Sequence, residues 1–202
     1  MNITYMGRLR GALAIAVVGI LSSLNSTAAD IPPVDGTKRL ISALPNSKLT
    51  LADGIQQAAK TGAPISAKFE FDDQGKLSLS VYTAEKGLAV GPEANSFLEL
   101  SGSPEQASWT PEAEIFKDAE HVTRASQQLS LMSTSRYSLL DLINKAQARA
   151  PGYAFVIIPG SLRDIPVALV ELALDGNVVN LVYNLQSGRL MSGTPPFGNP
   201  GD

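Results

Sequence analysis

The chain of 202 residues has no cysteine, one histidine and one tryptophan. Without cysteine it cannot form disulfides, a thiolate metal site or the acylated cysteine of a lipoprotein. With one histidine, a zinc site built from several histidines cannot form within one chain. Basic residues number 16 against 19 acidic ones. This balance argues against nucleic acid as a partner, because contacts to phosphate dominate that affinity.

Residues 1–29 have the pattern of a secretory signal. Two arginines precede an uncharged, mostly apolar run over 11–24, and small residues follow it. The run is shorter than the roughly 20 apolar residues that a spanning helix needs. We therefore expect cleavage after Ala28 or Ala29 rather than an uncleaved anchor, and no stable membrane span afterwards. An exported chain without cysteine suits a bacterial periplasmic or secreted protein.

One pattern of ten residues occurs twice, over 49–58 and again 88 residues later over 137–146. In each copy a hydroxyl residue, Thr50 or Ser138, stands three positions before an aspartate. This spacing is typical of a capped helix N-terminus. Apolar residues then recur at helical spacing. The two copies therefore predict two helices of the same design.

Segments that alternate between apolar and polar residues follow each helix, as expected for strands with one wet face. After the first helix they predict a hairpin over 65–83. After the second, Asp175-Gly176 is a strong signal for a two-residue hairpin turn. Pro159 is expected to interrupt a strand, which leaves 159–166 as a long loop. The strands expected in the second copy cover 153–158, 167–174, 178–183 and a short edge at 189–191.

These patterns predict an α+β protein with two units, each a helix packed on a small antiparallel sheet, and an extra helix between them. A strand is expected at 97–100, whereas 109–116 is ambiguous because Thr110-Pro111 could begin a helix. The expected organisation is a signal peptide over 1–29, a linker over 30–45, unit 1 over 46–116, a connecting helix over 117–133, unit 2 over 134–191 and a disordered tail over 192–202.

The two units resemble the PepSY domain family. The second unit carries the helix at 137–146, the Asp175-Gly176 turn and a terminal turn over 184–190, with Asn184 where the family has aspartate. The first unit keeps the helix and hairpin without the turn signatures. PepSY domains occur in protease propeptides, small secreted proteins and ectodomains of membrane proteins. The resemblance therefore implies control of a peptidase near the cell surface, and it brings no catalytic residues.

The residues themselves suggest no catalytic, metal or cofactor site. His121 is interpreted as a surface histidine on a polar helix face. Glu112 and Glu114 alternate with Ala113 and Ile115, so on a strand the two carboxylates would share one solvent-facing side. The acidic turn at 72–75 lacks the later glutamate of a calcium loop, and the chain has no glycine-rich phosphate loop. We therefore expect neither enzymatic activity nor a cofactor.

Arg163 and Asp164, in the expected loop over 159–166, are the first candidates for contact with a partner, because loops often carry function. We expect a non-enzymatic periplasmic binding module. It would modulate a peptidase, or act like a chaperone, by binding a protein or peptide at a sheet edge or face. The alternatives are a self-assembling envelope protein, a small-ligand binder with its pocket between the units, and a hydrolase that uses Glu112, Glu114 or His121.

Overall fold

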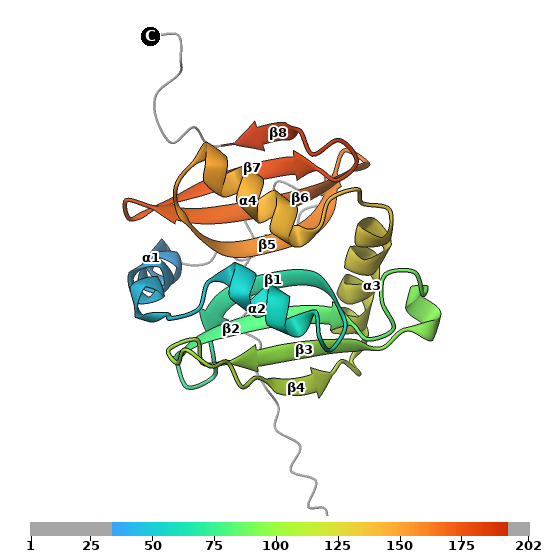
Figure 1. Cartoon of the computed structure of the whole chain (residues 1–202), viewed down its shortest axis with the longest axis horizontal. Coiled ribbons are helices and arrows are strands. Elements are labelled where there is room, and N and C mark those ends of the chain that lie inside the picture. The colour runs from blue at the N-terminus through green and yellow to red at the C-terminus, as the bar shows by residue number, and fades with distance from the viewer. Residues whose placement is uncertain (1–33, 194–202) are drawn as a thin grey trace, which may run out of the picture.

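A single antiparallel sheet of eight strands organises residues 34–193, the part of the chain that the computed structural model describes (Figure 1). The strand order is β4-β3-β2-β1-β5-β6-β7-β8. With four α-helices among these residues the fold is α+β, as predicted. The expected signal peptide and residues 194–202 of the expected tail lie outside the described range. The strands are β1 (Ala63–Phe71), β2 (Leu77–Ala84), β3 (Phe97–Gly102), β4 (Glu112–Ile115), β5 (Tyr153–Leu162), β6 (Ile165–Leu174), β7 (Asn177–Asn184) and β8 (Leu190–Gly193).

The helices are α1 (Val34–Ala43), α2 (Leu51–Ala58), α3 (Ala119–Ser133) and α4 (Leu139–Arg149), with short 3₁₀ turns η1 (Leu44–Asn46) and η2 (Pro92–Ala94). Both repeated helices begin at the expected caps. The Thr50 hydroxyl accepts a hydrogen bond from the Asp53 amide at 3.1 Å, and the Asp53 carboxylate accepts one from the Thr50 amide at 2.8 Å. Ser138 and Asp141 form the same reciprocal pair at the start of α4. The predicted capping boxes are confirmed.

The order of one helix followed by four antiparallel strands occurs twice, and β1 and β5 join the two sets at the centre of the sheet. Ala67 on β1 lies opposite Ile157 on β5. Each of these strands has a bulge at the same distance before that pair, at Ile65 and Phe155. The two halves therefore share one continuous sheet, which the sequence patterns did not predict.

Helices α2 and α4 cover the same face of the sheet (Figure 1). A row of buried apolar side chains crosses this face in register through both halves: Val81, Ala67, Ile157, Val170 and Leu181. Burial of each valine, isoleucine or leucine side chain in this row is worth roughly 1.5–3 kcal/mol. The segment expected as a linker also contributes, because it contains α1 and buries Leu40 and Leu44 in this core.

The predicted connecting helix is confirmed as α3, which stands at one end of the sheet beside both halves (Figure 1). It buries Ala125 and Leu129 against Ile65 and Phe97 of the first half. The Ser66 hydroxyl donates to Gln128 Oε1 at 2.8 Å, so that both buried polar side chains are satisfied. None of the described helices is long and apolar enough to cross a membrane.

Two details of the sequence-based assignment change. Within the ambiguous segment at 109–116, residues 112–115 form the edge strand β4, and none of the segment is helical. Pro159 does not interrupt its strand, because β5 continues to Leu162 with Pro159 opposite Ala168. Pairing of β5 with β1 is confined to Val156 and Ile157. From Pro159 onward no strand among residues 34–193 pairs with that side of β5, so the N–H that proline lacks costs no ladder bond there.

Candidate functional site

Arg163 and Asp164 do not lie in a long loop, as the sequence suggested. They form a two-residue turn between β5 and β6, closed by the pair Leu162 and Ile165. Both residues have positive φ, 50° for Arg163 and 64° for Asp164. Such a turn suits the twist of a hairpin, but it normally uses asparagine, aspartate and glycine. The other two-residue hairpin uses Asp175-Gly176, and an arginine is conformationally less favourable at such a position.

A hollow of about 380 Å³ opens beside this turn. Leu162, Arg163 and Ile165 from the turn contribute to its lining, together with Met191 and Ser192 from β8. The hollow is therefore mainly apolar, and Arg163 supplies the one charge among these lining residues. Arg163 makes no ion pair within residues 34–193, so its guanidinium is available to an anionic group.

Large exposed apolar side chains gather at the same place. Of the four in residues 34–193, two line the hollow: Ile165 is 36% exposed and Met191 41%. Leu190, 36% exposed, pairs with the core residue Tyr183, so its side chain lies on the other face of the sheet and it contributes its backbone to this corner. We call Leu162, Arg163, Ile165, Leu190, Met191 and Ser192 the β8 corner. Strand β8 is the last strand of the sheet, and all four of its residues are exposed. An exposed apolar edge strand is a surface that proteins usually cover or guard with charge.

The backbone of β8 also presents groups to a partner. The Asn184 amide donates to the Arg189 carbonyl at 2.9 Å, and the Asn184 carbonyl accepts from the Gly188 amide at 2.8 Å, so Gly188 and Arg189 together face Asn184 in a hydrogen-bonded bulge. The next pair, Tyr183 and Leu190, is then of the non-hydrogen-bonded kind, because the two kinds alternate along an antiparallel ladder. The N–H and C=O of Leu190 therefore point away from β7, toward the edge with which no other strand of residues 34–193 pairs.

The opposite edge, β4, has a different character. Its exposed residues include Glu112 and Glu114, which share one face of the strand, whereas Ile115 is 53% exposed on the other. Phe116 donates its amide to Phe97 on β3, so the N–H of Ala113 points outward by the same alternation. This edge carries charge close to its backbone, a feature that discourages strand pairing.

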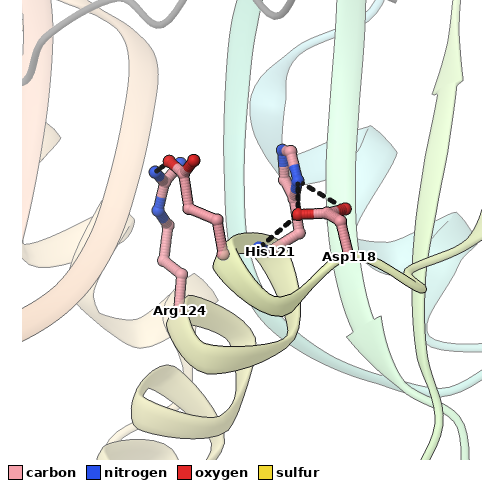
Figure 2. Close-up of polar contacts among 4 residues, drawn as sticks. Asp118, His121 and Arg124 are labelled. Carbon is pink, nitrogen blue, oxygen red and sulfur yellow. Dashed lines mark hydrogen bonds and ion pairs between the residues drawn. The ribbon is translucent and has the colours of Figure 1, made fainter. Parts of the chain in front are cut away.

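His121 lies in the first turn of α3, at the surface, as predicted (Figure 2). Asp118 caps the helix by accepting from the His121 amide at 3.0 Å, and its carboxylate also contacts His121 Nδ1 at 2.8 Å. The bond from the His121 amide is the main reason that the pKa of Asp118 is lowered. The imidazole ring packs on Phe116, with 5.1 Å between centroids. These contacts explain the pair as a helix cap.

A polar cluster covers the face of the first half opposite α2. Lys68 pairs with Glu70 at 2.6 Å and lies over the Tyr82 ring. Burial first, and then the charges of Glu70 and Glu99, raise the pKa of Tyr82. Burial, followed by the charge of Glu70, raises the pKa of Glu99. The members of this cluster are paired with one another, and the sequence patterns had not singled them out.

A second buried acid lies in the other half. Glu171 on β6 is 7% exposed, and burial raises its pKa from 4.5 to about 7. Asn180 lies opposite it on β7, and the Asn180 Oδ1 atom is buried without a hydrogen-bond partner. A protonated Glu171 carries the O–H donor that such an oxygen needs. The sequence held one signal for this group, since Glu171 is the only charged residue within β6.

Residues 34–193 contain no group of three histidine, cysteine, aspartate or glutamate side chains that could hold a metal ion. In comparisons with known proteins, no family model matches the chain, and no curated protein matches its sequence. One solved structure, of a candidate lipoprotein from Clostridium difficile 630, aligns with a TM-score of 0.39 and 12% identity. The alignment covers 73% of this chain and 93% of that one. A likeness this weak assigns neither family nor function, and the PepSY resemblance stays a prediction.

Proposed function

We propose that the protein is a non-enzymatic, PepSY-like binding module of the bacterial envelope that takes an extended polypeptide segment onto strand β8. The observation that supports this most is a hollow lined by the exposed Ile165 and Met191 beside β8, a strand edge with which no other strand of residues 34–193 pairs. A protease is the kind of partner that the family resemblance suggests.

Strand addition explains why backbone and side chains are both exposed at this place. An added segment would pair with the outward N–H and C=O of Leu190, which gives affinity without special side chains. An apolar side chain of the segment would enter the hollow beside Ile165 and Met191, which gives selectivity. The carboxylates of β4 make the opposite edge the poorer acceptor.

Self-association is the second candidate, because the same exposed edge could pair with β8 of another copy. The two functions differ in a simple measurement. Strand exchange between copies predicts that light scattering detects dimers or larger species at micromolar concentration. The binding module predicts a monomer until a peptide is added.

The test is to pan a phage-displayed library of random peptides with free carboxyl ends on the purified protein and then measure binding of the selected peptides to three variants. Leu190→Pro removes the outward N–H, whereas Leu190→Ala keeps it and removes a similar amount of apolar side chain. Ala113→Pro removes the corresponding N–H at the opposite edge.

We expect binding to be lost in Leu190→Pro, weakened in Leu190→Ala and kept in Ala113→Pro. The proposal is wrong if no peptide is selected, or if the selected peptides bind Leu190→Pro as well as they bind Leu190→Ala. Far-ultraviolet circular dichroism on each variant checks that the sheet has formed.

A further inference from the structure

The direction of β8 and the position of Arg163 narrow the class of ligand, in an inference that rests on the proposed function. Tyr183 pairs with Leu190, and Asn184 pairs with Val167. Strand β8 therefore begins at the end of the sheet that carries the Arg163 turn, and it runs away from that turn. In Figure 1 the arrow of β8 accordingly points in the opposite direction to the arrow of its neighbour β7.

A segment added antiparallel to β8 would run in the opposite sense, toward the turn. Antiparallel pairs outnumber parallel ones about two- to three-fold in proteins, and the strands of this sheet pair antiparallel throughout residues 34–193. The carboxyl end of such a segment would arrive at the hollow, where Arg163 supplies the charge among apolar lining residues.

We propose that the β8 corner recognises the free C-terminus of an extended polypeptide, with the terminal carboxylate on the Arg163 guanidinium and an apolar last side chain in the hollow. Three observations support this assignment. Arg163 has no ion-pair partner among the described residues. It keeps a turn position with a φ of 50°, where asparagine or glycine would be easier. Finally, Leu162, Ile165 and Met191 give the hollow walls suited to an aliphatic side chain.

Asp164 lies next to Arg163 in the same turn and provides a matched control. Its carboxylate would repel a second carboxylate, so an anionic ligand must be held by Arg163 in spite of it. A charge-assisted hydrogen bond to a carboxylate is worth about a tenfold change in affinity or somewhat more. Replacement of Arg163 should therefore cost about that factor, and Asp164→Asn should cost nothing.

The experiment uses short N-terminally labelled peptides of alternating threonine and valine that end in leucine. One has a free carboxyl end, the second ends in an amide, and the third ends in an amide but carries aspartate before the leucine. Fluorescence anisotropy measures their affinities for the wild-type protein, Arg163→Gln, Arg163→Lys and Asp164→Asn.

We expect the free carboxyl peptide to bind the wild-type protein about tenfold more tightly than the simple amide, and Arg163→Gln to bind both equally. Arg163→Lys should keep part of the preference, because it retains the charge without the planar fork. Asp164→Asn should keep all of it.

Equal affinity of the acid and amide for the wild-type protein overturns this inference and leaves strand addition standing. Preference for the internal aspartate overturns it in favour of a side-chain carboxylate. If none of the peptides binds, and panning also selects nothing, the proposed function fails with it.

Discussion

Replacement of Glu171 by glutamine should stabilise the protein at alkaline pH and change little at acidic pH. The carboxyl group has a pKa of about 7 in the folded protein, against 4.5 for its ordinary value, because it is buried. The folded state therefore binds its proton more tightly than the unfolded state does, and stability falls as pH rises from 4.5 to 7. At about 1.4 kcal/mol for each pH unit between the two values, ionisation costs the fold about 3 kcal/mol above pH 7.

Glutamine has nearly the same shape, does not ionise and can donate to the unpartnered oxygen of Asn180. Urea unfolding between pH 4 and pH 8 measures the effect as a difference between variant and wild type. That difference should be near zero at pH 4 and reach about 3 kcal/mol in favour of Glu171→Gln at pH 8. Glu105→Gln, at an exposed position, is the control and should show no such trend. Parallel stability curves for wild type and Glu171→Gln would refute the reasoning.

Four further predictions concern stability. Ser138→Ala removes the cap of α4 and should lower the free energy of unfolding by about 1 kcal/mol in urea titrations; an unchanged midpoint would contradict this. Replacing Arg163-Asp164 by Asn-Gly should raise the melting temperature by about 2–4 °C, because asparagine and glycine adopt the positive φ of these two positions more easily. A fall in melting temperature would contradict the positive-φ conformation of this turn. Gly188→Ala should lower the free energy of unfolding by more than about 1 kcal/mol, because Gly188 has a φ of 63° and packs on the Tyr137 ring. Gly36 lies in helix α1 with open space around it, so Gly36→Ala should raise the free energy of unfolding by about 0.5–1 kcal/mol.

Features set by neighbouring residues could be predicted from the sequence. The capping boxes at Thr50 and Ser138, the Asp175-Gly176 hairpin and α3 follow from short-range hydrogen bonding and periodicity, and all were found. The joining of the halves depends on Ala67 facing Ile157, two residues 90 positions apart. Periodicity within a strand does not say which strand lies beside it, so one continuous sheet could not be distinguished from two small ones.

The candidate site was predicted in part. Arg163 was chosen because the segment looked like a loop, and the structure instead places it at a tight turn beside a hollow. Pro159 misled the assignment, since the cost of its missing N–H depends on whether the neighbouring strand reaches it. Met191 and Leu190 become informative only when the exposure of their side chains is known. Apolar residues near the end of a chain give no such information by themselves.

Amide hydrogen exchange by NMR tests strand addition at β8 most directly. With saturating free-carboxyl peptide, exchange at the outward amide of Leu190 should slow by at least about tenfold, because that N–H gains an acceptor. The outward amide of Ala113 on β4 should exchange at the same rate with and without peptide. Protection at Ala113 with none at Leu190 would contradict the account.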